Sequence, residues 1–210
     1  MVFALDRAGI TGPDGPSHHG VYDLALLTKV PGMRVLAPSS AQELQQMLLD
    51  AVRLADDGPV AIRYPRGSAR LVDEHEIGVG LSARRVRAGD GSGCVLAVGK
   101  MVDTATKAAE RLAAEGRSIE VWDVRSCAPL DPDMLTAAAA CRFVVTIEDG
   151  VRAGGVGSAI ADSLGALAPE LPVEMLGLPT RFIPHGEAHH ILARLGLDAD
   201  GVAALLRERL

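Results

Sequence analysis

Apolar and polar residues alternate in short blocks along the chain, and the blocks predict strands and helices in turn. In the first half they predict strands at 2–7, 33–38 and 59–67 and helices at 21–30 and 44–55. The order strand, helix, strand, helix, strand indicates parallel strands joined by right-handed crossovers. Ser39 or Ser40 is the expected N-cap of the second helix, and Glu43 would complete a capping box with Ser40.

A second alternation follows a less periodic segment, 67–93, which contains charges, glycines and one possible edge strand at 82–89. The second half predicts strands at 94–99, 119–124, 143–149 and 173–178, with helices at 101–116, 131–141 and 157–167 and from about 188 onward. This pattern is typical of a doubly wound α/β domain that is complete in itself. We place the domain boundary near residue 80, so that the domains span 1–80 and 81–210.

The first half, in contrast, looks truncated. Three strands are fewer than the five or six of a usual open sheet. The strand at 2–7 has the apolar composition of a buried strand, yet it would lie at an edge without a neighbour on one side. We therefore expect the chain to be a fragment or to need a partner chain.

Composition narrows the class of protein. Of the 210 residues, 48% are hydrophobic, 23% are charged and only 3% are aromatic, and the formal net charge is -6. A negative chain with few aromatic residues lacks the basic surface and the stacking platforms that bind nucleic acid. The N-terminus does not resemble a signal peptide, and no apolar run is long enough to span a bilayer, so we expect a soluble protein without a membrane partner.

The cysteines point to a reducing compartment. Cys94, Cys127 and Cys141 are odd in number and show no CxxC spacing, so they indicate neither a disulfide framework nor a zinc site. We expect a cytoplasmic protein.

Polar chemistry is concentrated in one irregular loop near the start, DRAGITGPDGPSHHG at 6–20. Arg7 follows the first expected strand and Arg66 follows the third. Because the carboxyl ends of parallel strands share one edge of a sheet, two arginines there can converge on a phosphate or carboxylate. Alternatively, each arginine pairs with a nearby acid such as Asp6 or Asp14 and is simply solvated.

The same loop offers groups that could move protons. His18 and His19 lie close in sequence to Asp14, and an imidazole beside a carboxylate is suited to proton transfer near neutral pH. Two histidines and one aspartate are too few for a convincing metal site. As an alternative, Asp14 and Ser17 serve only to cap the turn.

A glycine-rich turn at 151–160, VRAGGVGSAI, resembles a phosphate-binding turn between a strand and a helix. The pattern lacks full GxGxxG spacing, so its glycines could equally serve a tight turn.

Several motifs in order closely resemble the 1-deoxy-D-xylulose-5-phosphate synthase family, whose members are transketolase-like thiamine-diphosphate enzymes. They are LDRAGITGPDGPSHHGVYDLALL, MRVLAPSSAQELQQML, DGPVAIRYPRG, VVTIEDG with GGVGSAI, and GLPTRFIPHGEAHHILARLGLDADGV. The resemblance extends over essentially the whole chain. It implies the C-terminal part of the pyrimidine-binding domain followed by the transketolase C-terminal domain, whose family role is mainly packing and homodimer formation.

The resemblance also implies a reaction, in which pyruvate condenses with glyceraldehyde 3-phosphate and loses CO2 to give a precursor of isoprenoids, thiamine and pyridoxal. By position, Arg7 and Arg66 would hold the phosphate of the acceptor. His18 and Asp14 would lie beside the reacting carbons and assist proton movement and alignment.

The departures from the family pattern concern the cofactor. No GDG…N motif for the diphosphate and Mg2+ is present, and the family's activating glutamate would precede Met1. We therefore expect the main groups that bind thiamine diphosphate and Mg2+ to be absent from the chain, and the chain alone to be inactive. Two alternatives remain, namely a chain like the β-subunit of a 2-oxo acid dehydrogenase and a non-catalytic assembly module.

Overall fold

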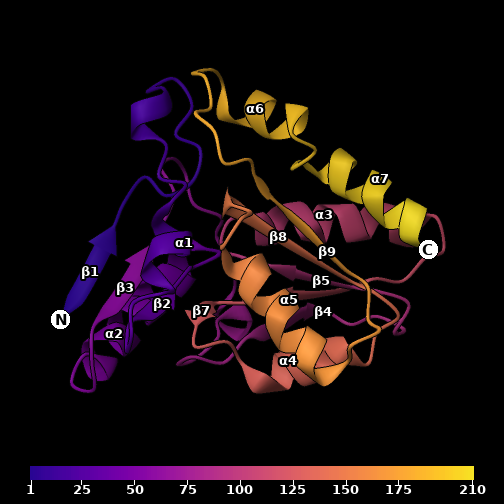
Figure 1. Cartoon of the computed structure of the whole chain (residues 1–210), viewed down its shortest axis with the longest axis horizontal. Helices are drawn as coiled ribbons and strands as arrows, with labels where there is room; N and C mark the ends of the chain where they lie inside the picture. The colour runs from indigo at the N-terminus through magenta and orange to yellow at the C-terminus, as the bar shows by residue number, and fades with distance from the viewer.

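The computed structural model describes all 210 residues and contains two sheets lying side by side (Figure 1). The strands are β1 (Val2–Leu5), β2 (Arg34–Leu36), β3 (Val60–Arg63), β4 (Arg84–Arg87), β5 (Cys94–Ala97), β6 (Glu120–Asp123), β7 (Ser126–Ala128), β8 (Val144–Val151) and β9 (Val173–Leu178). The helices are α1 (Asp23–Leu27), α2 (Ala41–Leu54), α3 (Met101–Ala114), α4 (Pro132–Ala139), α5 (Val156–Leu167), α6 (Ala188–Arg194) and α7 (Ala199–Arg209), with single 3-10 turns at Pro16–His18 and Glu74–Glu76. The expected α/β class is confirmed.

The second sheet has the strand order β4-β6-β5-β8-β9, in which only β4 is antiparallel to its neighbour. Alternate residues of its central strands enter two different cores, as a period of two requires. Val95 joins the core that contains Leu112 of α3 and Leu206 of α7, whereas Leu96 joins the core that contains Ile160 of α5. Helices therefore cover both faces of the sheet.

The first sheet has the order β1-β3-β2-β7, and its fourth strand comes from the second half of the chain. β1, β3 and β2 are parallel, as expected, while β7 pairs antiparallel with β2. The three strands expected of the first half are therefore present, and the second half adds a fourth that was not predicted. The other edge is β1, where Phe3 is 39% exposed.

The expected capping box at the start of α2 forms only in part. Ser40 caps the helix as predicted, since its Oγ accepts the Glu43 N–H at 3.0 Å. The Glu43 carboxylate, however, does not return to the cap. It accepts hydrogen bonds from the Arg125 Nε (2.9 Å) and the Gly78 N–H (2.6 Å), because a buried guanidinium and a buried amide both need an acceptor there.

Two buried arginines cross between the halves in opposite directions. Arg125, which immediately precedes β7, pairs with Glu43 of α2, and both side chains are almost fully buried. Arg63 at the end of β3 forms an ion pair with Asp149 of β8 that is equally buried. Ser39 adds a third link by donating to Asp123 of β6 at 2.5 Å. Buried polar contacts therefore join the two sheets, beside apolar cores that also contain residues of both halves.

Arg125→Met tests this interface. The substitution leaves Glu43 charged and buried without its cation, which typically costs about 3–5 kcal/mol. We expect urea unfolding to show a loss of that order in the free energy of unfolding. Arg53→Met is the matched control, because the Arg53 side chain is 78% exposed and its loss should cost less than about 0.5 kcal/mol. Equal losses for the two variants would contradict the importance of the buried pair.

Candidate functional site

The loop at 6–20 leaves β1 and is closed on itself at its base. The Ala8 N–H donates to the Tyr64 carbonyl at 3.0 Å, and the Gly9 N–H donates to the Gly20 carbonyl at 2.7 Å. A Cβ at Gly20 would lie 2.4 Å from the Arg7 carbonyl oxygen, and Gly9 has φ +76°. Glycine is therefore required at both ends of the closure, which explains part of the loop's unusual composition.

The structure brings Arg7, Arg66 and Asp14 together. Arg66 Nη1 donates to Asp14 Oδ2, and Arg7 Nη1 lies 3.9 Å from the same oxygen. Arg7 also lies 3.9 Å from Asp6. Hydrogen bonding to Arg66 lowers the pKa of Asp14 below its ordinary value. Both the convergence on one anion and the pairing with local acids are thus present, and the anion between the guanidinium groups is the Asp14 carboxylate.

His18 lies at the end of the Pro16–His18 turn and is exposed. Its Nδ1 is 3.1 Å from Ser17 Oγ, and no hydrogen bond joins the ring to Asp14. The imidazole therefore lies close enough to Asp14 to contribute to the lowering of its pKa, but no hydrogen bond to the carboxylate orients it.

His19, in contrast, is buried, with 8% of the residue exposed. The Thr11 N–H donates to its Nδ1 at 3.1 Å, which makes Nδ1 the acceptor and leaves the proton of the neutral ring on Nε2. That Nε2 is buried without a hydrogen-bond partner among the protein atoms. The two adjacent histidines consequently differ, one being available at the surface and the other fixed in the loop.

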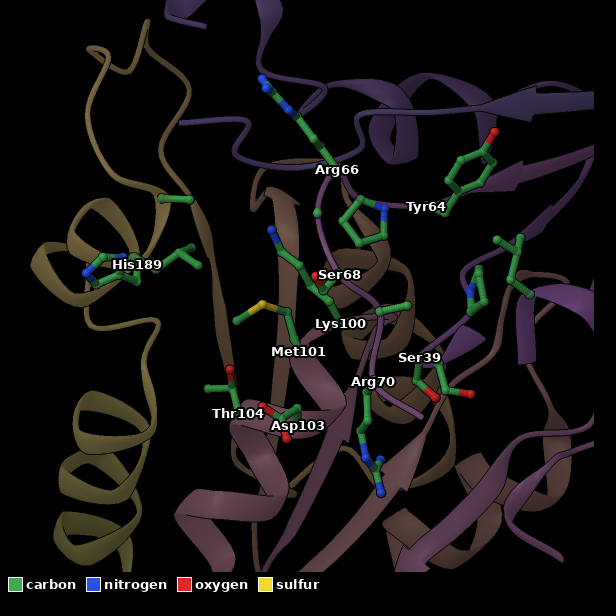
Figure 2. A pocket seen from close by; sticks show the side chains of 18 residues that line it. Ser39, Tyr64, Arg66, Ser68, Arg70, Lys100, Met101, Asp103, Thr104 and His189 are labelled. Carbon is green, nitrogen blue, oxygen red and sulfur yellow. The ribbon is translucent and has the colours of Figure 1, made fainter. Parts of the chain in front are cut away.

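A cleft of about 750 Å³ lies beside the arginine pair, between the segment after β3 and helices α3 and α6 (Figure 2). Its lining includes four groups that can carry positive charge, namely Arg66, Arg70, Lys100 and His189. In Figure 2, the Arg66 side chain turns away from the other labelled side chains. Arg66 therefore stands between the cleft and the loop at 6–20.

The glycine-rich turn at 151–160 leads into α5 as expected, but the N-terminus of that helix is already occupied. Glu148 accepts hydrogen bonds from the Val156 N–H (3.2 Å) and the Gly157 N–H (2.8 Å). A Cβ at Gly155 would lie 2.5 Å from the same carboxylate. The phosphate-binding interpretation of this turn was wrong, because a side chain of the preceding strand fills the anion position.

A second buried cluster lies directly beneath the loop, and the sequence analysis did not find it. Asp149 accepts from Arg63 Nη1, and its Oδ2 lies 3.2 Å from Lys100 Nζ. Arg63 Nε also donates to Asp23 at 2.9 Å. Burial disfavours a charged Asp149, but the charges of Arg63 and Lys100 outweigh that effect and lower its pKa to about 2. The available signal was a charged residue near the carboxyl end of each of two mainly apolar strands, Arg63 in β3 and Asp149 in β8.

These residues do not by themselves fit a diphosphate and its metal ion. No group of three or more His, Cys, Asp or Glu side chains is placed to hold a metal. The glycine turn has no free helix N-terminus, because Glu148 takes it.

Two family models match the chain in sequence order. Residues 1–72 match "Transketolase, pyrimidine binding domain", and residues 82–202 match "Transketolase, C-terminal domain". The chain belongs to the transketolase family. In a comparison of structures, this transketolase-family chain superimposes along its whole length on 66% of a "Split gene transketolase, inactive beta4 tetramer", with a TM-score of 0.86 and 29% identity.

Among curated proteins, this transketolase-family chain is similar to 1-deoxy-D-xylulose-5-phosphate synthases. It is 44% identical to that of Chlorobium luteolum, over 99% of the chain and 33% of the relative. It is 43% identical to that of Magnetococcus marinus, over 100% of the chain and 34% of the relative, and 41% identical to that of Thermobifida fusca, over 99% and 33%. The chain thus spans about a third of the length of these relatives.

Glu148 gives the site a pH dependence that can be measured. Burial raises its pKa from 4.5 to about 7, although the Gly157 and Val156 amides favour the charged form. The folded state then binds more protons than the unfolded state between these values, so the free energy of unfolding falls as pH rises through that window. In urea unfolding, the decrease in the free energy of unfolding across this pH window should be smaller in Glu148→Gln than in the wild type, by up to roughly 3 kcal/mol. Glu170 is exposed, so Glu170→Gln serves as the control and should show the same decrease as the wild type. If Glu148→Gln also shows the wild-type decrease, the pH dependence does not come from Glu148.

Proposed function

We propose that this chain acts as the C-terminal portion of a 1-deoxy-D-xylulose-5-phosphate synthase, which condenses pyruvate with glyceraldehyde 3-phosphate and releases CO2. The observation that carries the proposal is the meeting of Arg7 and Arg66 over a single carboxylate oxygen, at the carboxyl ends of two adjacent parallel strands. Guanidinium groups in this arrangement suit the phosphate of the acceptor. Similarity to synthases over nearly the whole chain supports the choice of substrates.

Asp14 then holds the arginine pair in the absence of substrate. The Arg7 and Arg66 side chains are 50% and 52% exposed, and ion pairs between such exposed groups contribute little to stability. A phosphate with up to two negative charges can therefore replace Asp14 at little cost. The displaced carboxylate would become available to orient His18, in keeping with the proton-transfer role proposed for these two residues.

The remaining groups of the active site belong, in this proposal, to the roughly two thirds of the synthase that this chain does not cover in its relatives. Thiamine diphosphate and Mg2+ would bind there, and the chain alone would be inactive. The description of the similar split-gene protein as an inactive tetramer of β chains is consistent with this division. The product would feed the synthesis of isoprenoids, thiamine and pyridoxal.

We further propose a homodimer in the cytoplasm. β1 leaves one edge of the first sheet unpaired, and three large apolar side chains of α2 are exposed: Leu48, Leu49 and Val52. Open edges and apolar patches of this kind favour association. All three cysteines are free thiols, which fits a reducing compartment, and none of the helices is long and apolar enough to cross a membrane.

The division of the active site predicts the behaviour of the chain on its own. With thiamine diphosphate, Mg2+, pyruvate and glyceraldehyde 3-phosphate, we expect no 1-deoxy-D-xylulose 5-phosphate by mass spectrometry. Co-expression with the first two thirds of the Chlorobium luteolum synthase should give product, with the intact relative as positive control. Product from the chain alone would refute the division, and its absence from the co-expressed pair would count against the synthase assignment.

Arg66→Ala tests the phosphate role in the same co-expressed pair. A lost hydrogen bond to a charged group is worth about 1.5–3 kcal/mol, so the KM for glyceraldehyde 3-phosphate should rise roughly 10- to 100-fold while the KM for pyruvate stays nearly constant. Arg85→Ala serves as the control, since Arg85 is an exposed arginine on the edge strand β4. An unchanged KM in Arg66→Ala would favour a 2-oxo acid dehydrogenase type of acceptor instead.

A further inference from the structure

Two chain segments carry the proposed phosphate-binding arginines, and a single carboxylate of the second half touches both of them. Arg7 lies two residues before Gly9, and Arg66 lies three residues after Arg63. Asp149 of β8 binds Arg63 and packs against Gly9. The separation of the two arginines therefore depends on where each segment meets this carboxylate.

The contact with Gly9 is close enough to fix the loop. A Cβ at this position would lie 2.0 Å from Asp149 Oδ2, so the carboxylate rests directly against the glycine backbone. The next residue toward Arg7 is Ala8, whose N–H donates to the Tyr64 carbonyl. A displacement of Gly9 would consequently be passed to the backbone of Arg7 within two residues.

The contact with Arg63 fixes the other segment in the same way. Arg63 is 2% exposed and ends β3, and its guanidinium is held by Asp149 on one side and Asp23 on the other. Tyr64, Pro65 and Arg66 follow it without an intervening helix or strand. Lys100, the residue immediately before α3, completes the cluster, with its Nζ 3.2 Å from Asp149 Oδ2.

From these contacts we infer that Asp149 is a positioning residue, which sets the distance between Arg7 and Arg66 and hence the affinity for the acceptor phosphate. The inference rests on the proposed function, in which the arginine pair binds that phosphate. Side chains that bind a substrate together must be held to within about 0.5 Å of their productive positions, and a displacement of about 1 Å can reduce activity about 100-fold. The second half would then contribute directly to substrate recognition.

A purely structural role is the competing explanation, and the chain offers a matched control for it. Glu43 is also a buried carboxylate paired with a buried arginine across the same interface. Its carboxylate binds the Arg125 guanidinium and the Gly78 N–H, and it makes no hydrogen bond or ion pair to the loop at 6–20 or to residues 64–66. Loss of Glu43 should therefore weaken the interface without moving the arginines.

The experiment compares Asp149→Asn with Glu43→Gln in the full 210-residue chain. Glyceraldehyde 3-phosphate is titrated by NMR, and hydrogen exchange of the Ala8 and Gly9 amides is followed in parallel. We expect Asp149→Asn to weaken binding at least tenfold and to accelerate exchange at both amides. Glu43→Gln should lower the urea midpoint yet leave the dissociation constant within about twofold. Equal changes of affinity in the two variants would overturn the positioning role.

Gly9→Ala provides a test that leaves both buried ion pairs chemically intact, in case Asp149→Asn does not fold. Its Cβ would collide with the carboxylate, so we expect the same loss of affinity, and wild-type affinity would again overturn the inference. Arg66→Ala separates this result from the proposed function. If Arg66→Ala binds glyceraldehyde 3-phosphate as tightly as the wild type, the proposed phosphate role of Arg66 is wrong. The hydrogen exchange of the Ala8 and Gly9 amides then tests the positioning role by itself. Faster exchange in Asp149→Asn supports the positioning of the loop by Asp149, and unchanged exchange rejects it.

Discussion

The structure depends on charges that are buried between its two sheets. Arg63 reaches from the first half to Asp149, and Arg125 reaches back from the second half to Glu43. An isolated buried charge is very unfavourable, so each arginine is stable only while its partner is in place. The halves are consequently held in one relative arrangement, since a shift would separate two ion pairs together. Apolar packing alone, which is not directional, would not impose this restriction.

The division of the chain into two domains is less sharp in the structure than in the sequence. β7 belongs by position to the second half, yet it pairs with β2 and forms an edge of the first sheet. The resemblance implied mainly packing and dimer formation for the second half. In the structure β7 pairs with β2, Asp149 lies against Gly9 and Arg63, and residues of α3 and α6 line the cleft beside Arg66.

Local pattern was sufficient to predict most of the fold. The strands and helices of the second half follow from apolar periodicity, and Ser40 was recognisable as an N-cap from its neighbours. Long-range pairing was not predictable in this way. Glu43 meets Arg125 82 residues away, so a local capping box was the simpler expectation. β7 has three residues, too few to show a period, and it exists because β2 offers it an unpaired edge.

The candidate site shows the same limit. The convergence of Arg7 and Arg66 followed from parallel strand order, because strand ends on one edge are neighbours whatever the details of packing. The Asp149 cluster depends on which side chain of a second sheet lies under Gly9, and that requires the relative placement of the halves. The binding residues Arg7 and Arg66 can thus be predicted from the strands that they follow. Asp149, which is proposed to position them, cannot be predicted in this way because it acts across the interface between the halves. In this chain the irregular loop obtains its rigidity from that interface, through a carboxylate that only a glycine allows to approach.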